Sequence, residues 1–456
     1  MTSYDVVVVG SGPGGYLAAI LAAQRGLKTA CIEKERLGGV CLNWGCIPSK
    51  ALLRAAEQYR FILDEAAAFG IKVDNAGFDY AKVIARSRKI ADQSERGVKF
   101  LFKKYGVTTI TGTATVEGPG QVRVGDEIIA GKHIILATGA RARTFPNIET
   151  DGQRILTYRE AIASPDQPTS IIILGSGAIG AEFAYFFNSF GTSVTLVEGA
   201  DRIAPVEDAA VSSELEKSFK KQGIVVRKGT FCESVKRDGN DVVVALKGGE
   251  MLRASHALLA IGIAPNSEGL GLEKAGIVVE RGFVKVDKSY RTSAAGFYAI
   301  GDLSGPPALA HTAYAEAHVC IARIAGEHAP DVDYGNMPAA TYCQPQIGSV
   351  GLTEDAARSK GLDFTVGTFP FAANGKARAI GSSDGFVKVI IGKKYGEILG
   401  AHLIGHDVSE LLANFVMARG AEVTAEHFLH TVHAHPTLGE AMYEAVAEAV
   451  GKGAHL

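Results

Sequence analysis

The feature that most constrains the fold of this chain is a segment that occurs twice. The first copy, residues 6–33, has the sequence VVVVGSGPGGYLAAILAAQRGLKTACIE, and the second, residues 171–198, has IIILGSGAIGAEFAYFFNSFGTSVTLVE. In each copy a continuous apolar run predicts a buried parallel strand, a G-x-G-x-x-G turn leads into a helix, and a second strand ends in glutamate. A lone glycine-rich turn can serve packing alone, but two complete units at matched spacing predict two dinucleotide-binding sites.

The aligned residues of the two copies are expected to make the same contacts with a dinucleotide. The glycines let the backbone approach a pyrophosphate at the positive end of the helix, and the terminal carboxylate accepts from a ribose hydroxyl. At the second site a carboxylate repels a 2′-phosphate, and no basic residue follows it before Arg202, so NAD is favoured over NADP. The aligned positions are Gly10, Gly12, Gly15 and Glu33 in the first copy and Gly175, Gly177, Gly180 and Glu198 in the second.

One position breaks the repeat, because Leu17 in the first copy becomes Glu182 in the second. Two interpretations remain open. Glu182 is either a half-exposed acid that the helix dipole stabilises, or the neighbour of a ligand or of a buried lysine, since a buried carboxylate is costly without a partner.

Length and composition are those of a globular protein with several domains. The 456 residues are 47% hydrophobic and carry a net charge of −2 without a Lys/Arg run, so we expect no nucleic acid and no membrane surface as a partner. The N-terminus lacks the regions of a signal peptide, and no stretch of about 18 apolar residues predicts a membrane span. Six cysteines are too few for a secreted disulfide framework, which favours the cytoplasm.

The order of predicted strands and helices indicates an α/β fold with two Rossmann-like dinucleotide-binding domains and a C-terminal α+β domain. Between them, FYAIGDLSGPPALAH predicts a further strand, a Gly-Asp turn and a helix, which form a central part. The predicted boundaries are 1–142, 143–265, 266–337 and 338–456.

A close cysteine pair, Cys41 and Cys46, follows the first unit within GGVCLNWGCIPSKALL. A metal knuckle, a structural staple and a redox pair are the alternatives. Zinc needs four ligands at short spacings, and the remaining cysteines do not supply them. Pro48 is typical of a helix start, and a helix start favours a thiolate. In a regular helix, residues five apart exceed the roughly 7 Å Cα limit for a disulfide, so the first turn is expected to be broken, and a strained bridge is easily reduced. The other cysteines, which each stand alone, are Cys31, Cys232, Cys320 and Cys343.

These motifs together resemble one known family, the pyridine nucleotide-disulfide oxidoreductases, over essentially the whole chain. The likeness rests on the cysteine segment, the two glycine fingerprints, ILATGA, FYAIGDL and HAHPTLGE, and it is strongest to the branch that oxidises dihydrolipoamide. It implies FAD in the first unit, NAD in the second, and a C-terminal dimerisation domain. It also implies that Cys41 exchanges with the substrate, that Cys46 forms a charge-transfer thiolate against the flavin, and that Lys50 pairs with Glu182.

The resemblance further implies which residues contact each cofactor. A turn aspartate such as Asp302 is often only structural, but in the family pattern it contacts the ribityl chain. The FAD positions are Gly10, Gly12, Gly14, Gly15, Glu33, Lys50, Gly112, Thr138, Gly139, Ala140, Asp302, Ala308, Leu309, Ala310 and His311. The NAD positions are Gly175, Gly177, Gly180, Glu182, Glu198, Cys232 through its backbone, and Gly262.

Three histidines lie in HTVHAHPTLGE near the C-terminus. Clustered histidines attract divalent metals, but no matching cluster completes a ligand set, so we expect no metal. The resemblance implies that His435 and Glu440 form an acid–base dyad that reaches the disulfide of the other subunit. Proton transfer to a base is what thiol–disulfide exchange requires. His433 is expected to pack in the same loop.

The resemblance also implies the partners. They are the lipoyl domain of 2-oxo-acid dehydrogenase or glycine cleavage complexes and a second copy of the chain in a homodimer. Another NAD(P)H-dependent disulfide reductase and a flavin-bound subunit without turnover are the alternatives. Glu198 argues against the first because it disfavours NADP, and the intact set of reactive residues argues against the second. Trp44 departs from the family pattern, where valine is frequent, and is interpreted as a packing variant.

Overall fold

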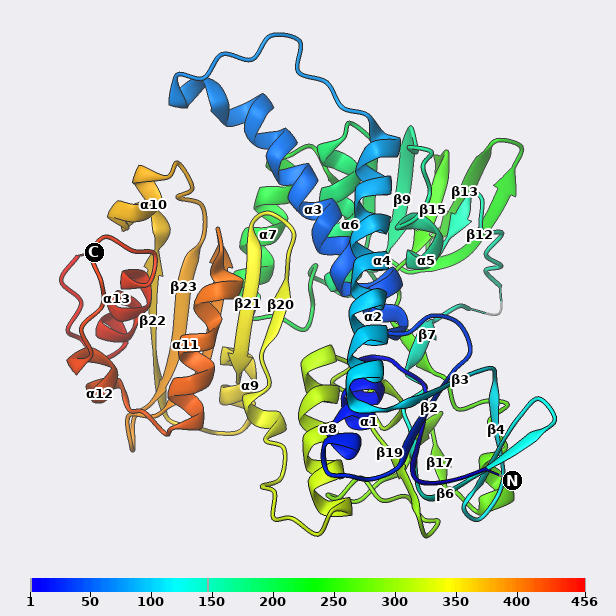
Figure 1. Cartoon of the computed structure of the whole chain (residues 1–456). Coiled ribbons are helices and arrows are strands. Elements are labelled where there is room, and N and C mark those ends of the chain that lie inside the picture. The colour runs from blue at the N-terminus through cyan, green and yellow to red at the C-terminus, as the bar shows by residue number, and fades with distance from the viewer. Residues whose placement is uncertain (1, 146, 456) are drawn as a thin grey trace. The chain divides into compact units, whose positions relative to one another are not determined.

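The computed structural model describes residues 2–145 and 147–455. They form two compact units, each assembled from segments that are far apart in the sequence (Figure 1). Unit 1 consists of Met1–Ala51, Ile84–Arg143 and Gly262–Val332. Unit 2 consists of Leu52–Val83, Thr144–Ile261 and Asp333–Leu456.

Unit 1 is built around a sheet with the strand order β3-β2-β1-β6-β5-β4, in which β19 also pairs with β6. The strands β1, β2, β3, β6 and β19 run parallel. The apolar run of β1 is buried, as expected for a parallel strand covered on both faces. The strands are β1 (Thr2–Val9), β2 (Thr29–Glu33), β3 (Thr108–Thr111), β4 (Ala114–Gly118), β5 (Gln121–Val124), β6 (Glu127–Leu136) and β19 (Phe297–Ala299).

Two helices of unit 1, α1 (Pro13–Gln24) and α8 (Ala310–Ile324), pack against each other. Gly14 permits this contact, because a Cβ there would lie 3.1 Å from the Cβ of Ala313. Helix α3 (Cys46–Arg60) begins in unit 1, and most of α4 (Tyr80–Tyr105) belongs to it. The smaller elements are α2 (Gly39–Trp44), β7 (Ala140–Ala142), β16 (Ile263–Pro265), η3 (Leu272–Ala275), β17 (Val279–Glu280), β18 (Phe283–Val284) and η4 (Gly301–Leu303).

Unit 2 contains a second parallel sheet with the order β11-β10-β9-β15-β8, and an antiparallel sheet β12-β13-β14. Its strands are β8 (Ile155–Leu156), β9 (Ser170–Leu174), β10 (Ser193–Val197), β11 (Val225–Arg227), β12 (Cys232–Asp238), β13 (Asp241–Leu246), β14 (Met251–Ala254) and β15 (His256–Leu259). Its helical elements are η1 (Phe61–Glu65), η2 (Ala66–Phe69), α5 (Tyr158–Ala161), α6 (Ala178–Ser189) and α7 (Ala209–Lys221).

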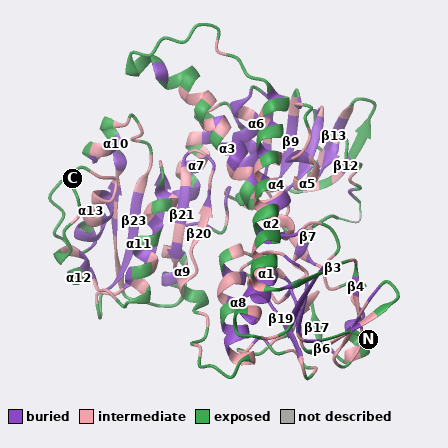
Figure 2. Ribbon diagram, in the orientation of Figure 1, coloured by how far each residue is buried: buried purple, intermediate pink, exposed green. Residues whose placement is uncertain are grey.

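The C-terminal part of unit 2 is an antiparallel sheet with the order β20-β21-β24-β23-β22, against which α11 and α13 pack. Figure 2 shows that the strands are largely buried and that exposed residues gather on the helices and loops. The strands are β20 (Ala339–Thr341), β21 (Gln346–Gly351), β22 (Phe364–Pro370), β23 (Phe386–Gly392) and β24 (Ile398–Gly405). The helical elements are η5 (Tyr334–Asn336), α9 (Glu354–Ser359), η6 (Phe371–Ala373), α10 (Gly375–Ala379), α11 (Val408–Gly420), α12 (Ala425–His430) and α13 (Glu440–Ala449).

The predicted fold class is confirmed, with two parallel sheets of the dinucleotide-binding type and a C-terminal α+β part. The two compact units combine the four predicted segments into pairs. Residues 262–332 join unit 1, where β19 extends the first sheet, and residues 333–456 join unit 2. Within the described ranges, the helices are either too short or too polar to cross a membrane.

Candidate active site

The first glycine-rich loop connects β1 to α1 and leaves an open space at the helix N-terminus. Gly10 has a φ of +98°, and a Cβ there would overlap the carbonyl oxygen of Ala137. A Cβ at Gly15 would overlap the carbonyl oxygen of Gly10 in the same way. At Gly12, by contrast, a Cβ would meet no atom within 4 Å. The outer glycines therefore shape the turn, and the middle one leaves room where a helix N-terminus attracts phosphate.

The carboxylate at the end of β2 is held against this loop. Glu33 Oε2 accepts from the backbone N–H of Ser11 at 3.0 Å and from the Ser11 hydroxyl at 2.7 Å. Its Oε1 accepts from the N–H of Glu35 at 2.9 Å. A carboxylate fixed beside a glycine loop is placed to accept from a ribose hydroxyl.

Other predicted FAD positions surround the same sheet edge. Gly112, with a φ of +149°, follows β3 and donates its N–H to the Glu33 carbonyl at 2.9 Å. Thr138 and Gly139 follow β6 and are fixed by Asn266, whose side chain donates to the Thr138 carbonyl at 2.9 Å. Ala140 begins β7. The carboxyl ends of parallel strands thus bring these residues together in unit 1, as open α/β sheets do around a ligand.

The segment after β19 adds a half-buried acid to unit 1. Asp302 lies in η4, and burial raises the pKa of its carboxyl group. Nearby, the N–H of Gly301 donates to Glu316 at 2.6 Å. A buried carboxyl needs a polar partner, and a ligand with several hydroxyl groups fits that need. The predicted run Ala308, Leu309, Ala310 and His311 leads into the first turn of α8.

Two buried polar atoms of unit 1 also fit a polar ligand. Among the described residues, Thr312 Oγ1 in α8 and Asn43 Oδ1 in α2 have no hydrogen-bond partner. Buried polar atoms are rarely left without partners in folded proteins. Together with the open space at Gly12, they fit a cofactor that combines a pyrophosphate with hydroxyl groups.

The cysteine pair lies where two short helices meet. Helix α2 ends at Trp44, and α3 begins at Cys46. Between them Gly45 adopts φ −133° and ψ −119°, and a Cβ there would lie 3.3 Å from the Cα of Cys41. The predicted break in the helix is present, and glycine lets the two cysteine-bearing turns approach each other.

The two cysteines, which the structure has as thiols, are not equivalent. A hydrogen bond with Cys46, followed by burial, raises the pKa of the Cys41 thiol, and Lys50 opposes this shift. Cys46 is the first residue of α3, and a helix N-terminus favours negative charge. The expected lowering of a thiol pKa therefore does not apply to Cys41.

The second glycine loop, between β9 and α6, repeats the geometry of the first. Gly175 has a φ of +97°, and a Cβ there would overlap the carbonyl of Ala260. A Cβ at Gly180 would overlap Gly175, whereas one at Gly177 would meet no atom within 4 Å. The loop therefore provides a second open space at a helix N-terminus, in unit 2.

The carboxylate of the second site is held as in the first. Glu198 accepts from the N–H of Ser176 at 2.9 Å, from the Ser176 hydroxyl at 2.6 Å, and from the N–H of Ala200 at 2.9 Å. The next basic residue, Arg202, pairs with Asp355 at 3.3 Å. A negative charge without a basic neighbour suits a ribose hydroxyl better than a 2′-phosphate.

Glu182 is buried in α6, which decides against the interpretation as a half-exposed acid. Its carboxylate accepts from the N–H of Tyr342 at 3.0 Å. Tyr342 follows β20, and nothing in the sequence pointed to this contact. Lys50 belongs to unit 1 and Glu182 to unit 2, so the pairing of the two stays a prediction.

Two further predicted NAD positions lie in different units. Cys232 begins β12 in unit 2, where burial raises the pKa of its thiol to about 11. Gly262, with a φ of +102°, belongs to unit 1 and accepts at its carbonyl from the N–H of Arg143 at 3.0 Å. Gly262 follows Ala260 and Ile261, whose backbone lies against Gly175 of the second glycine loop, so the roles of Cys232 and Gly262 both stay predictions.

The C-terminal histidine and glutamate form a dyad in unit 2. His435 Nδ1 and Glu440 Oε1 are 2.8 Å apart, and Glu440 Oε2 accepts from the N–H of Thr437 at 2.8 Å. Although burial opposes it, the bonds from Thr437 and His435 lower the pKa of Glu440. An ionised carboxylate only accepts, so Nδ1 carries the proton and Nε2 of the neutral ring is the basic atom. The His435 side chain is 79% exposed, so it is accessible to a reactant.

Other histidines of this segment have packing roles. His433 bonds through Nδ1 to the Thr431 carbonyl at 3.0 Å, and its ring lies against Phe428 and Tyr443. This agrees with the expected packing role. In the part of the chain that the structure describes, no group of three or more His, Cys, Asp or Glu residues is arranged to hold a metal ion.

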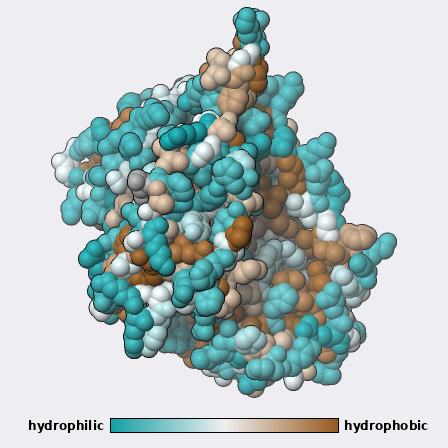
Figure 3. Space-filling view, turned by 90° about the vertical axis from the view of Figure 1, so that its left-hand side faces the viewer, coloured by the Kyte–Doolittle hydropathy of each residue, from teal (hydrophilic) through white to brown (hydrophobic). Residues whose placement is uncertain are grey.

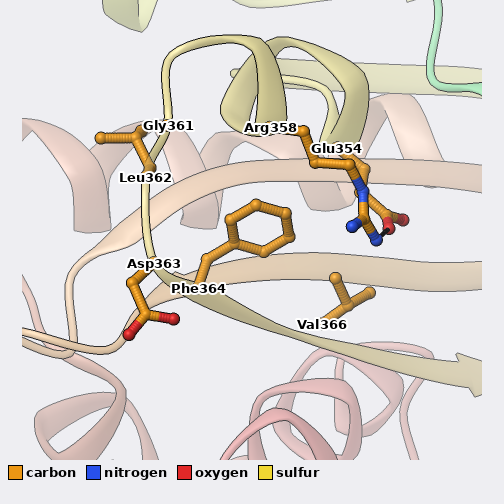
Figure 4. A pocket seen from close by; sticks show the side chains of 7 residues that line it. All are labelled: Glu354, Arg358, Gly361, Leu362, Asp363, Phe364 and Val366. Atoms are coloured by element: carbon orange, nitrogen blue, oxygen red, sulfur yellow. Dashed lines mark hydrogen bonds and ion pairs between the residues drawn. The ribbon is translucent and has the colours of Figure 1, made fainter.

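An open pocket on unit 2 lies apart from all predicted positions. Helix α9 and the start of β22 form it, and the Arg358 guanidinium lies 5.5 Å from the centre of the Phe364 ring (Figure 4). Its lining residues are Glu354, Arg358, Gly361, Leu362, Asp363, Phe364 and Val366. None of them is a reactive group of the predicted chemistry, so this pocket is not the candidate site.

One feature of unit 1 lies outside the predicted positions, a pair of hydrogen-bonded tyrosines. The hydroxyls of Tyr16 in α1 and Tyr314 in α8 are 2.5 Å apart. The repeat held a signal, because Tyr16 aligns with Ala181 in the second copy. Tyr314 had none, since only the packing of α1 on α8 brings the two together.

Two family models match the chain. Residues 4–317 match the pyridine nucleotide-disulphide oxidoreductase model, and residues 337–446 match the dimerisation domain of pyridine nucleotide-disulphide oxidoreductases. The two matches together span both parallel sheets and the C-terminal antiparallel sheet.

Similar proteins match over nearly the full length. A dihydrolipoyl dehydrogenase of Zymomonas mobilis is 44% identical over 462 residues, covering 99% of both chains, and one of Mycobacterium bovis is 46% identical over 461 residues with the same coverage. Among solved structures, LpdA from Mycobacterium tuberculosis superposes with a TM-score of 0.91 at 29% identity, covering 98% of this chain and 99% of the other. The HOCl-induced flavoprotein disulfide reductase RclA from Escherichia coli gives 0.88 at 28%, covering 97% and 99%.

Proposed function

Because the chain belongs to the pyridine nucleotide-disulphide oxidoreductase family, we propose that it acts as a dihydrolipoyl dehydrogenase, which oxidises dihydrolipoamide and reduces NAD. The observation that carries the proposal is the full-length likeness to enzymes of that name at 44–46% identity. The asymmetric pair of Cys41 and Cys46 supports it, because a working dithiol needs one thiol for exchange and one that ionises first.

Its cofactors are FAD and NAD, as in the family. FAD is assigned to the loop at Gly12 with Glu33 and Asp302 in unit 1, and NAD to the loop at Gly177 with Glu198 in unit 2. Each loop leaves space at a helix N-terminus for a pyrophosphate. The half-buried Asp302 and the unpartnered oxygen atoms of Thr312 and Asn43 suit the longer, hydroxyl-rich FAD.

The residues of the chain divide the thiol chemistry among them. His435 of the partner subunit takes a proton at Nε2 from dihydrolipoamide, and the substrate thiolate attacks Sγ of Cys41 in the oxidised pair. The Cys41–Cys46 bond breaks, and Cys46 leaves with the electron pair. The second substrate thiolate attacks the substrate sulfur bound to Cys41, which forms lipoamide and releases Cys41 as a thiolate. The chemistry that FAD supplies when bound is acceptance of this electron pair as the Cys41–Cys46 disulfide re-forms, and its transfer, with a proton, to NAD as a hydride.

This mechanism requires a homodimer, because the dyad of His435 and Glu440 acts at the cysteine pair of the other subunit. The match of residues 337–446 to a dimerisation domain supports it. Large apolar side chains in this region are exposed, Met417 at 76% and Val432 at 94%. Figure 3 shows hydrophobic side chains among hydrophilic ones on one face of the molecule.

The macromolecular partner proposed is a lipoyl domain of a 2-oxo-acid dehydrogenase or glycine cleavage complex. Dihydrolipoamide is carried on such domains in the reaction assigned here. We place the enzyme in the cytoplasm. Cys31 and Cys320, which are buried thiols, suit a reducing compartment.

The first test is an anaerobic titration of the purified yellow protein with dihydrolipoamide. We expect long-wavelength thiolate–flavin absorbance that is lost in Cys46→Ser, followed by reduction of added NAD. A protein that reduces no NAD with dihydrolipoamide, but turns over another disulfide with NADPH, would overturn the assignment.

A second test addresses the proposed role of His435 as the base. His435→Gln is expected to keep FAD and fold but to lose roughly 10²–10⁴-fold in dihydrolipoamide turnover, which is the usual contribution of a positioned base. His433→Gln, in the same loop, is the matched control and should keep most of the activity. Equal rates for His435→Gln and the parent would remove His435 from this role.

A further inference from the structure

One exposed aromatic ring of unit 2 lies beside the ribose carboxylate of the second glycine loop. Phe231, between β11 and β12, is 61% exposed. Its ring lies over Gly199, because a Cβ built on Gly199 would be 2.4 Å from Cε1, 2.7 Å from Cδ1 and 3.0 Å from Cζ of the ring. Gly199 directly follows Glu198, which Ser176 holds in place. The ring is therefore next to the group that is placed to accept from a ribose hydroxyl.

Backbone hydrogen bonds fix the segment that carries this ring. The N–H of Thr230 donates to the Glu198 carbonyl at 3.1 Å, and the Phe231 carbonyl accepts from the N–H of Lys247 at 2.8 Å. The ring is thus held between the end of the second strand, at Glu198, and the strand β13, which Lys247 follows. Glycine at position 199 leaves the space that the ring occupies.

The carboxylate of Glu198 indicates which way a bound nucleotide runs. Its Oε2 accepts from the N–H of Ser176 in the glycine loop at 2.9 Å, and its Oε1 accepts from the N–H of Ala200 at 2.9 Å. In a dinucleotide, the pyrophosphate and the adenine are attached to opposite ends of the ribose. With the pyrophosphate at the glycine loop and the ribose at Glu198, the adenine is directed past the carboxylate toward Gly199 and Phe231.

A phenyl ring in this place suits an adenine. One part of the Phe231 ring lies on the Gly199 backbone, and its exposure leaves the rest open to a ligand. Flat rings are stabilised by stacking, and base–aromatic stacking needs no matched hydrogen-bonding groups, because every base has a π-face. The first glycine loop lacks this arrangement, since Lys34 and not a glycine follows Glu33.

We propose that Phe231 stacks on the adenine ring of NAD bound at the second loop, and that Gly199 positions the phenyl ring for this contact. The proposal deepens the proposed function and rests on it for the presence of NAD at this loop. Phe231 contacts the part of NAD that does not react. It therefore acts on the affinity for NAD and not on the rate of hydride transfer.

The experiment measures binding of ADP-ribose to the FAD-loaded protein by isothermal titration calorimetry. ADP-ribose carries the adenosine and both phosphates of NAD but no nicotinamide. Phe231→Ala is expected to raise its Kd about five- to a hundredfold, the range for loss of one base–aromatic stack. Phe231→Tyr keeps the stacking ring and should stay within about twofold of the parent. Gly199→Ala keeps Phe231 but displaces its ring, and should raise the Kd by about threefold or more.

Steady-state turnover separates stacking from a general distortion of the loop. Phe231→Ala should raise KM for NAD and leave kcat within about twofold of the parent, because only uniform binding is lost. The value of kcat/KM for nicotinamide mononucleotide, which lacks the adenosine, should not change. The FAD content should also stay that of the parent, since the first loop has no part in this contact.

Phe100→Ala is the matched control, because Phe100 on α4 is exposed to a similar degree, 65%. It should leave ADP-ribose binding unchanged. An unchanged Kd in Phe231→Ala or Gly199→Ala would overturn the proposal. An equal loss of kcat/KM with nicotinamide mononucleotide would also overturn it, since that is the result of a distorted loop. A parent protein that binds no ADP-ribose would instead overturn the assignment of NAD to this loop, so the two failures are distinguishable.

Discussion

The two glycine loops of this protein are alike in themselves and different in what surrounds them. In both, a loop serine donates its N–H and its hydroxyl to the glutamate at the end of the second strand. The hydroxyl bond is 2.7 Å from Ser11 to Glu33 and 2.6 Å from Ser176 to Glu198. This internal bond fixes the carboxylate before any ligand arrives, which lowers the cost of binding.

The helices that follow the loops have different neighbours. In unit 1, Gly14 of α1 packs against Ala313 of α8, and Tyr16 bonds to Tyr314. In unit 2, the position of Tyr16 is alanine, and Glu182 is buried with its carboxylate bonded to a backbone N–H. The two loops therefore share one geometry, whereas the elements that pack against the following helix differ between the units.

The largest expected effect is the loss of activity when a reactive cysteine is removed. The reactive pair distinguishes the two units, because it follows only the first loop. Cys41→Ser removes the exchanging sulfur and should lower dihydrolipoamide oxidation by roughly three orders of magnitude or more, as loss of a nucleophile does. Steady-state NAD reduction checks this. Cys320→Ala, a buried cysteine of the same unit, is the control and should retain turnover. Residual activity of Cys41→Ser near that of the control would contradict the role.

The next effect concerns an ion cluster within unit 2, between the N-terminus of α7 and the C-terminal sheet. Lys388 Nζ lies 2.8 Å from Asp208 and 2.7 Å from Glu354, and the Lys388 and Asp208 side chains are 7% and 1% exposed. Lys388→Ala leaves Asp208 buried without its cation, which should cost about 3 kcal/mol of stability. Lys393→Ala breaks an exposed pair and should cost less than about 1 kcal/mol by denaturant unfolding. Equal losses for the two variants would contradict this account.

This ion cluster also predicts a pH dependence. The two carboxylates hold the pKa of Lys388 above its ordinary value, although burial alone would lower it. Its stabilising effect is therefore complete below the unfolded pKa of about 10.4 and is lost as pH rises further. For Asp208, burial opposes the shift, but its bonds lower the pKa, so its effect is complete above about pH 3.9 and is lost on acidification. The stability gap between the parent and Lys388→Ala should narrow at both extremes of pH.

A third pair of variants sharpens the comparison of the loops directly. Gly12→Ala and Gly177→Ala each add a methyl group where no protein atom lies within 4 Å, so both should fold. Each should weaken its own cofactor about tenfold or more, because the backbone can no longer approach a pyrophosphate. FAD retention and NADH titration should respond to Gly12→Ala and Gly177→Ala respectively, so each variant is the control for the other. Loss of both cofactors in either variant would contradict separate sites.

The smallest effect tests the choice of nicotinamide cofactor. Glu198→Gln removes a negative charge at the second loop and should raise kcat/KM for NADP relative to NAD by about five- to tenfold. Glu33→Gln at the first loop should leave this ratio unchanged. An unaltered ratio in Glu198→Gln would mean that another group rejects the 2′-phosphate.

Most of the fold could be predicted from the sequence, because its signals are local. The strand, glycine turn, helix and second strand of each copy lie within one continuous segment, so periodicity and glycine spacing were sufficient. Contacts between segments that are distant in the sequence could not be predicted in this way. The bond from Tyr342 to Glu182 and the pairing of Tyr16 with Tyr314 join residues whose spacing follows no pattern.

The sequence alone determined the two nucleotide loops, their glutamates, the family and the presence of a close cysteine pair, since each is a short motif with a fixed backbone geometry. Only the tertiary structure decided that Cys46 begins a helix whereas Cys41 lies in the preceding one, that Glu182 is buried, and that His435 is oriented by Glu440 at 2.8 Å. The physical reason is that ionisation and orientation depend on neighbours in space. Burial, a helix terminus and a hydrogen-bond partner act over a few ångströms, whatever the distance along the chain.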